Sequence, residues 1–304
     1  MPYVISFVSF DFYTFLHCLP LLSTAVTLII LNPIDFEVGA LINHRYSVFN
    51  RIGFGSFASA FRVVDTKDGY AEKVCKTIRI SEDPSNKHES EVLALKSCLG
   101  LSRWPQISDH FATKSFKTIV VSFEGESIYD VLERNTPSRF SNANILRLSY
   151  GIFDAIQTLH GVGFVHRDIT QDNVMLKRVK EGVMVNMIDL GNCAKVDPPT
   201  KCMYNSINTS LHVMKTHLYT TYDDLISALY LLIEISGSEL FDLKMPLLQA
   251  KEKLANIITL IDQQKAQKSS NISTIWSKLE NAIPEVSPYS PITFKTVNGK
   301  LILE

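Results

Sequence analysis

Two kinds of hydrophobic pattern divide the chain. Between residues 45 and 122, short β-branched and aromatic runs such as RYSVFNRIG, FASAFRVVD, YAEKVCK and KTIVVSF are separated by turn residues, which predicts a small antiparallel sheet. Within this stretch, residues 86–98 have apolar positions at helical spacing. After Gly125 helical spacing prevails, and residues 141–159 and 222–235 each predict a long helix. We therefore expect an α+β fold, β-rich first and mostly helical second.

The change of pattern sets the expected domain boundaries. We expect an apolar extension over residues 1–44, a small β-rich lobe over 45–122, a larger helical lobe over 123–285 and a tail over 286–304. The segments KEKLANIITLIDQQ and ISTIWSKLENAI predict two further helices in the second lobe.

Residues 12–31 form an uncharged apolar run of the length that crosses a bilayer as a helix. Pro20 and His17 interrupt it, and no Lys or Arg precedes it, which disfavours a signal peptide. Two readings stay open: a membrane anchor that leaves the following lobes in the cytosol, and an apolar extension without an anchoring role.

Composition excludes some partners. The formal net charge is -1, so no overall field attracts this chain to nucleic acid. The five cysteines are scattered and form no CxxC pair, which indicates reduced thiols in the cytoplasm. Nothing in the sequence specifies an oligomeric state.

The first candidate for chemistry is RIGFGSFASAF, in which Gly53 and Gly55 lie between two expected strands. Such a turn can bring backbone N–H groups close to a phosphate chain. Many hairpins contain two glycines at this spacing, so the motif alone is weak. Ala58 stands where a third glycine is expected.

A strand lysine follows in YAEKVCK, where Ala71 and Lys73 fit the A-x-K pattern that presents a lysine to the α- and β-phosphates of a nucleotide. Its expected partner is Glu91 on the next helix, with Glu89 as the alternative.

The strongest signal is HGVGFVHRDITQDNVML, which contains every fixed residue of H-R-D-x-x-x-x-N. In that pattern Asp168 orients the acceptor hydroxyl or accepts its proton, and Asn173 ligates magnesium. Further along, an apolar strand ends in Asp189-Leu190-Gly191, where Asp189 is expected to bind magnesium between the β- and γ-phosphates. The order of these motifs makes a chance match improbable.

With VGFVHRDI, the segments YNSIN (204–208) and DDLISALYLLIE (223–234) make residues 45–242 resemble casein kinase 1 and tau-tubulin kinases. The resemblance implies a bilobal protein-kinase fold, ATP and Mg²⁺ as cofactors, and a cytoplasmic enzyme that phosphorylates Ser or Thr of proteins. It also implies that Val121 lies beside the adenine and that Asp224 hydrogen-bonds the catalytic loop. The implied catalytic residues are Asp168, Lys73, Glu91 and Arg167, and the implied metal ligands are Asn173 and Asp189. The implied nucleotide-binding residues are Ile52, Gly53, Phe54, Gly55, Ser56, Phe57, Ala60, Ala71, Lys73, Val121, Phe123 and Met175.

Three positions depart from this family. Thr170 stands where a lysine normally neutralises the transferring phosphate, Lys201 replaces a threonine near the catalytic aspartate, and Met203 replaces an arginine of an anion site. Two functions are therefore compared: an active Ser/Thr kinase, and a catalytically impaired scaffold that binds nucleotide or a protein partner.

Overall fold

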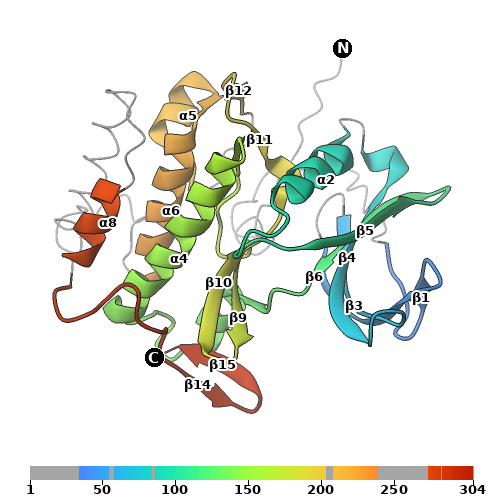
Figure 1. Ribbon diagram of the computed structural model, residues 1–304, viewed down its shortest axis with the longest axis horizontal. Helices are drawn as coiled ribbons and strands as arrows, with labels where there is room; N and C mark the ends of the chain where they lie inside the picture. Colours follow the sequence, from blue (N-terminus) through green and yellow to red (C-terminus); the bar gives the residue numbers. More distant parts are fainter. Residues whose placement is uncertain are drawn as a thin grey trace, which may run out of the picture. The chain divides into compact units, whose positions relative to one another are not determined.

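A computed structural model describes residues 34–54, 58–83, 86–202, 208–237, 273–281 and 283–303 (Figure 1). The chain divides into two compact units, the first comprising residues 1–88 and 107–123 and the second residues 89–106 and 124–304. The first unit thus ends close to the change of hydrophobic pattern, whereas residues 89–106 group with the second unit.

The first unit is built on a six-stranded antiparallel sheet of order β1-β2-β3-β4-β6-β5. Its strands are β1 (Leu41–Ile42), β2 (Tyr46–Phe54), β3 (Ala58–Asp65), β4 (Ala71–Arg79), β5 (Ile107–Ala112) and β6 (Phe116–Ser122). A 3₁₀ turn, η1 (Ile80–Glu82), follows β4. Strict alternation along β3, where every second residue is buried, shows that one face of the sheet carries the core.

That core includes residues before the predicted sheet. Ile34 and Ile42 pack with Tyr46, Phe61 and Val120 in one buried cluster. The predicted extension over residues 1–44 therefore contributes its described part, from residue 34, to the core of the first unit.

A partly buried ion pair links strands of this sheet. Arg45 donates two hydrogen bonds of 2.7 Å to the fully buried carboxylate of Asp65, while Tyr46 donates one of 3.0 Å to Asp109. The bond from Arg45 lowers the pKa of Asp65, although burial acts against it. The start of β2 is thereby linked to the end of β3 and to β5.

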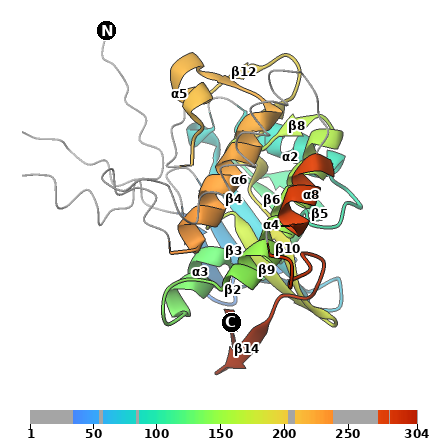
Figure 2. The same ribbon diagram turned by 90° about the vertical axis from the view of Figure 1, so that its left-hand side faces the viewer.

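The second unit is mainly helical (Figure 1, Figure 2). Its helices are α2 (Lys87–Ser97, which begins in the first unit), α3 (Ile128–Arg134), α4 (Asn142–Gly161), α5 (Leu211–Thr216), α6 (Thr221–Ile235) and α8 (Ser273–Glu280), with a 3₁₀ turn η2 (Leu190–Asn192). Its short strands are β7 (Glu126–Ser127), β8 (Phe164–Val165), β9 (Val174–Val179), β10 (Gly182–Met187), β11 (Ala194–Lys195), β12 (Thr200–Lys201), β13 (Leu218–Tyr219), β14 (Phe294–Val297) and β15 (Lys300–Leu303).

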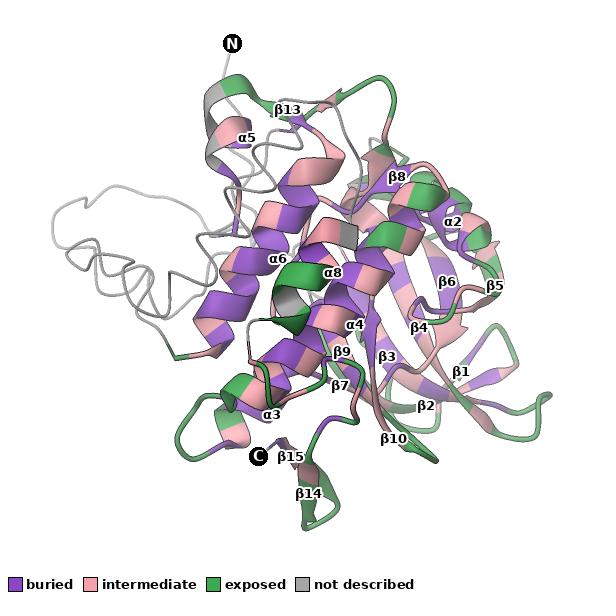
Figure 3. Ribbon diagram, turned by 60° about the vertical axis from the view of Figure 1, so that its left-hand side comes forward, coloured by how far each residue is buried: buried purple, intermediate pink, exposed green. Residues whose placement is uncertain are grey.

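Helices α4 and α6 form the centre of this unit, and both begin where the sequence provides a cap. Ser141 accepts a hydrogen bond from the N–H of Asn144, and Thr220 forms a reciprocal capping box with Asp223. Both helices bury an apolar stripe, which appears as a run of buried residues along each ribbon (Figure 3). The helices predicted over residues 86–98, 141–159 and 222–235 are confirmed within one or two residues at each end.

The three-stranded sheet β10-β9-β7 packs against α4 and carries the loop that holds the candidate site. Gly151 on α4 permits a close approach, since a Cβ there would lie 2.6 Å from the Cβ of Val185 on β10. Gly125 has a φ of +95°, and a Cβ there would lie 2.3 Å from the carbonyl oxygen of Leu176. Both positions therefore require glycine.

The predicted tail is folded. Strands β14 and β15 form a hairpin that packs on α3, where Arg134 donates to the carbonyl of Leu301 at 3.1 Å and Asn135 to that of Leu303 at 2.9 Å. The helix predicted from ISTIWSKLENAI is present as α8, whereas the one predicted from KEKLANIITLIDQQ lies outside the described residues.

Among the described residues, no helix is both long enough and apolar enough to span a membrane. The apolar run at residues 12–31 lies outside them. The predicted α+β fold is confirmed, with a sheet-based first unit and a mainly helical second unit.

Replacing Gly125 with alanine is expected to destabilise the protein by about 2–4 kcal/mol, because the substitution adds a steric clash to a left-handed backbone. Urea unfolding would measure it. The matched control is Gly299→Ala, where φ is +78° but no atom lies within 4 Å of the added Cβ, so about 1 kcal/mol is expected. Equal losses for both variants would show that the contact with Leu176 has no role.

Candidate active site

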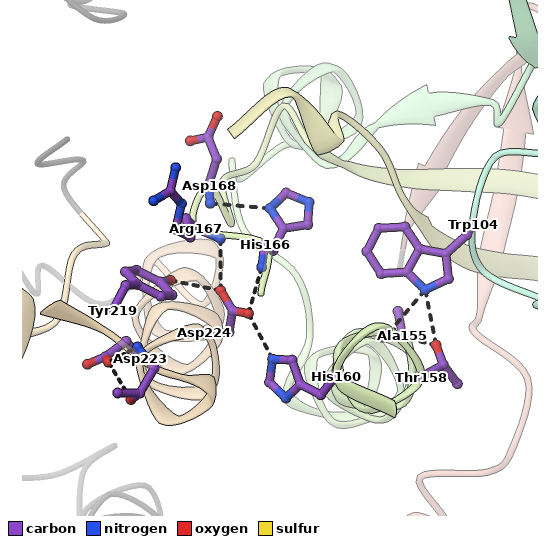
Figure 4. A network of polar contacts seen from close by, with 11 residues as sticks. Trp104, Ala155, Thr158, His160, His166, Arg167, Asp168, Tyr219, Asp223 and Asp224 are labelled. Carbon is purple, nitrogen blue, oxygen red and sulfur yellow. Dashed lines mark hydrogen bonds and ion pairs between the residues drawn. The ribbon is translucent and has the colours of Figure 1, made fainter. Parts of the chain in front are cut away.

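The buried carboxylate of Asp224, near the start of α6, organises the candidate site (Figure 4). Its two oxygens accept hydrogen bonds from the backbone N–H groups of His166 at 2.8 Å and Arg167 at 3.0 Å. They also accept bonds of 2.8 Å from the hydroxyl of Tyr219 and from Nε2 of His160. Four donors from three separate segments thus converge on one carboxylate, as the resemblance predicted for the catalytic-loop backbone.

Electrostatics keeps Asp224 ionised. Burial alone would raise the pKa of this carboxyl, but the hydrogen bond from His160, the electrostatic interactions with the His160 and His166 rings and the N–H of Arg167 together lower it. A charged hydrogen-bond acceptor is stronger than a neutral one, so the negative charge strengthens its hold on the loop.

His166 and Arg167 turn the chain toward Asp168. Nδ1 of His166 accepts from the N–H of Asp168 at 3.2 Å, so Nε2 carries the proton and donates to the carbonyl of Ile188 at 3.0 Å. Arg167 has a φ of +69°, a costly conformation for a side chain of this size that Asp224 helps to hold. The HRD segment is therefore fixed through its backbone.

Asp168 and Asn173 are joined across the loop. Nδ2 of Asn173 donates to the main-chain oxygen of Asp168 at 2.9 Å, and the backbone of Asn173 contacts Thr170 and Ile188. Because Nδ2 of Asn173 is the donor, its amide oxygen is the group that a cation would bind.

Asp189 lies close to Asp168, at the end of the strand that precedes η2. It adopts a left-handed conformation with φ of +62°, and its carboxylate accepts from the N–H of Gly191 at 3.0 Å. Burial raises the pKa of Asp168, and the negative charge of Asp189 raises it further. His166 and hydrogen bonds from Asn192 and Asn173 act in the opposite direction. Three predicted site residues, Asp168, Asn173 and Asp189, are thus brought together in the second unit.

This donor set fits a magnesium ion shared with a ligand. Carboxylate and amide oxygens are the hard ligands that Mg²⁺ prefers, and it commonly takes one or two from protein and the rest from phosphates and water. Across the described ranges, no group of three or more His, Cys, Asp or Glu residues could hold a metal by itself. Asp189 and Asn173 offer two oxygen ligands of this kind.

The strand lysine occupies an unexpected face of the first-unit sheet. Lys73 on β4 lies directly opposite Val63 on β3 and Ser122 on β6. Opposite residues project to the same face, so Lys73 is on the face that carries the buried core. Its ammonium group ion-pairs with Asp68 at 3.5 Å and donates to Ser108 at 3.2 Å.

Two other predicted nucleotide-binding residues, Val121 and Ala60, lie on the other face. Val121 is opposite Val74, and Ala60 is opposite Lys76, in pairings that show no register shift from β3 through β4 to β6. Since side chains alternate between faces, Val121 and Ala60 share their face with Lys76 and not with Lys73.

The A-x-K spacing therefore fits this strand at two positions. Ala71 and Lys73 lie on the core face, and the same spacing recurs three positions later in Val74 and Lys76. A shift by an odd number of residues moves the whole pattern to the opposite face of a strand. Lys73, Ala60 and Val121, all predicted to bind nucleotide, therefore do not share one face of the sheet.

The remaining predicted residues are distributed between the units. Ile52, Gly53 and Phe54 end β2, and Phe123 lies just after β6 with the Arg62 guanidinium 4.4 Å from its ring centre. In the second unit, Met175 is half-buried on β9 and Glu91 is buried on α2, near Cys193. Gly55, Ser56 and Phe57 lie outside the described residues.

Comparison with known proteins decides the family. Residues 46–300 match the model of the protein kinase domain. The chain belongs to the protein kinase family. The bilobal α+β fold implied by the resemblance is the fold of this family, and the described units agree with it.

The relatives compared with this chain are distant. A Caenorhabditis elegans protein named as a casein kinase I is 24% identical over 66% of this chain and 63% of its own length. An Encephalitozoon cuniculi protein named as a casein kinase I homolog is 26% identical over 64% of the chain and 63% of its own. A second Caenorhabditis elegans protein, named as a serine/threonine-protein kinase, is 27% identical over 46% and 40%. The chain spans less than two thirds of the length of each.

Several contacts of the candidate site had no clear signal in the sequence. His160 begins the segment that contains the H-R-D motif but is not one of its fixed residues, and Tyr219 falls in no motif, yet both bind Asp224. Asn192 donates to the carboxylate of Asp168 at 3.1 Å, and Lys76 is revealed only by strand register. His160 could have been sought as a polar residue at the end of an apolar helical stripe, whereas Tyr219 lies in a polar segment.

The departures seen in the sequence can be placed in part. Thr170 is half-buried in the catalytic loop. The side chain of Lys201 is exposed, and its carbonyl accepts from Nη1 of Arg167 at 3.2 Å. Met203 lies outside the described residues.

Replacing Asp224 with asparagine is expected to reduce the free energy of unfolding at pH 7 by about 2–4 kcal/mol, because buried donors lose a charged acceptor. Because the folded pKa of Asp224 is lowered, wild type holds this advantage above the unfolded pKa of about 3.9 and loses it as pH falls further. Urea titrations of both proteins between pH 3 and pH 8 would measure the difference.

Asp197→Asn serves as the control, since Asp197 is an exposed aspartate of the same unit and should change stability by less than about 0.5 kcal/mol. A difference between wild type and Asp224→Asn that does not depend on pH would argue against an ionised Asp224.

Proposed function

We propose that this chain is an ATP-dependent protein serine/threonine kinase of the casein kinase 1 group. The observation that supports it best is the grouping of Asp168, Asn173 and Asp189 on a loop whose backbone is fixed by Asp224. The match to the protein kinase domain and the names of the distant relatives support the same activity.

In this proposal each residue of the second unit has a defined role. Asp168 receives the hydrogen bond of the acceptor hydroxyl and takes up its proton as phosphate is transferred. Asn173 and Asp189 hold Mg²⁺, which neutralises charge on the ATP phosphates when it is bound. Arg167 contributes by fixing the loop, through the carbonyls that it binds at Asn192 and Lys201.

For the phosphate lysine we propose Lys76 in place of Lys73. Lys76 shares a sheet face with Ala60 and Val121, which we assign to the adenine environment, and Val74 takes the position first given to Ala71. Lys73 is engaged with Asp68 and Ser108 on the core face, which suits a structural role. Glu91 remains the proposed carboxylate partner of the phosphate lysine.

The other nucleotide contacts stay proposals from the resemblance. Ile52, Gly53 and Phe54 together with residues 55–57 form the glycine-containing turn over the phosphates, and Phe123 and Met175 border the adenine.

The proposed assignment to the casein kinase 1 group rests on residues around the catalytic loop. Asn208, the last residue of the YNSIN segment typical of casein kinase 1 and tau-tubulin kinases, is buried and donates to the carbonyl of Ile169 at 3.0 Å. This bond connects the family-specific segment to the residue after Asp168. A protein acceptor and a cytoplasmic location follow from the proposal, and the free thiols of Cys75, Cys98, Cys193 and Cys202 suit that compartment.

Thr170 favours a second candidate function. Without the lysine that neutralises the transferring phosphate, a nucleotide-binding scaffold with little activity is the competing proposal. The two differ in one measurable quantity, the rate of phosphate transfer at saturating ATP.

Transfer of radiolabelled γ-phosphate from ATP to casein is expected to require Lys76 and Asp168 but not Lys73. Lys76→Met and Asp168→Asn should lower kcat/KM by about 100-fold or more, whereas Lys73→Met should change it by less than about threefold because its contacts are surface polar pairs. Strong loss in Lys73→Met with an active Lys76→Met would reverse the assignment. If wild type and Asp168→Asn transfer phosphate equally poorly while ATP still raises the melting temperature, the scaffold proposal is supported.

Restoring the charge at position 170 is expected to increase turnover. Thr170→Lys places an ammonium group two residues after Asp168, and about tenfold higher kcat is predicted from a gain in electrostatic stabilisation of the transferring phosphate. Thr170→Met, which adds similar length without charge, is the control. An equal gain in both variants would show that charge is not the limiting factor.

A further inference from the structure

Asn192 is a polar residue with no assigned role that touches the proposed catalytic base. It ends η2, directly after Gly191, and its Nδ2 donates to Oδ2 of Asp168 at 3.1 Å. Both residues belong to the second unit.

The main chain of Asn192 is held by the same network that holds the catalytic loop. Nε of Arg167 donates to the carbonyl of Asn192 at 2.5 Å, and the N–H of Arg167 is bound by Asp224. The next residue, Cys193, closes the 3₁₀ turn by donating to Leu190 at 3.1 Å. The amide of Asn192 is therefore presented to Asp168 from a fixed backbone.

The backbone of Asp168 is restrained on both sides, but these backbone contacts do not fix its side chain. Its N–H is bound by His166 and its carbonyl by Asn173, which leaves the carboxylate to rotate about its side-chain bonds. The hydrogen bond from Asn192 occupies Oδ2 and limits that rotation. Oδ1 can accept a further hydrogen bond, since a carboxylate has two oxygens and each can accept.

Resting on the proposed kinase activity, we propose that Asn192 is a positioning residue that orients the carboxylate of Asp168 toward the acceptor hydroxyl. Misplacing a catalytic group by about 1 Å costs on the order of 10²-fold in rate, so the effect on turnover should be large. Because Asn192 acts on Asp168 and not on the nucleotide, ATP affinity should not depend on it.

The test compares Asn192→Leu, which keeps the branching at Cγ but removes the donor, with Asn192→Asp, which keeps the shape but offers only an acceptor. Both should lower kcat for casein phosphorylation by about tenfold or more, with KM for ATP within about twofold of wild type. Asn142→Leu, an exposed asparagine at the start of α4, is the control and should match wild type. Melting temperatures of all variants, with and without Mg-ATP, report on folding.

Each outcome has a defined meaning. Unchanged kcat in Asn192→Leu overturns the positioning role, and so does a fall in kcat accompanied by a raised KM for ATP and a lowered melting temperature, which indicates structural damage. Should Asn192→Leu fail to fold, the isosteric Asn192→Asp decides by the same criteria. No transfer by wild type overturns the proposed kinase function, and this inference with it.

Discussion

The site depends on one buried carboxylate that serves four donors from three parts of the chain. Asp224 fixes two consecutive backbone N–H groups, those of His166 and Arg167, immediately before Asp168. Its partners His160 and Tyr219 come from the end of α4 and from β13. Because α4 and α6 bury their apolar stripes in the core of the second unit, the carboxylate is held by the best-packed part of that unit. The packing of these helices thereby fixes Asp224, and Asp224 in turn fixes the position of the loop.

The electrostatic character of the site follows from this arrangement. The loop and η2 bring Asp168 and Asp189 close enough for the charge of one to raise the pKa of the other. Two nearby carboxylates in a partly buried setting favour a cation. The amides of Asn173 and Asn192 surround Asp168 with neutral donors, and Thr170 adds no charge. In the proposed kinase, bound magnesium and the strand lysine would therefore carry more of the charge neutralisation than in relatives with a lysine at position 170.

The sequence predicted the helices of the second unit better than the faces of the first-unit sheet. The residues of HRD…N and D-L-G lie near one another because each motif is a short loop whose residues are close in sequence. Helix boundaries succeed because Ser141 and Thr220 supply caps before apolar stripes. Lys73 misleads because a strand presents alternate residues to opposite faces, and its sequence alone does not reveal which face is covered. The face of β4 that is covered is determined by β6 and by residues 34–42, which are distant from Lys73 in sequence. The contacts of His160 and Asn192 likewise depend on tertiary folding.

The central claim is that Asp224 immobilises the catalytic loop by binding its backbone N–H groups. Residue-resolved hydrogen exchange of the amides of His166 and Arg167, in wild type and in Asp224→Asn at pH 7, tests it most directly. The account predicts strong protection of both amides in wild type. In the variant, their protection factors should fall by at least about tenfold more than those of core helix amides. Equal protection of the two amides in both proteins would contradict it.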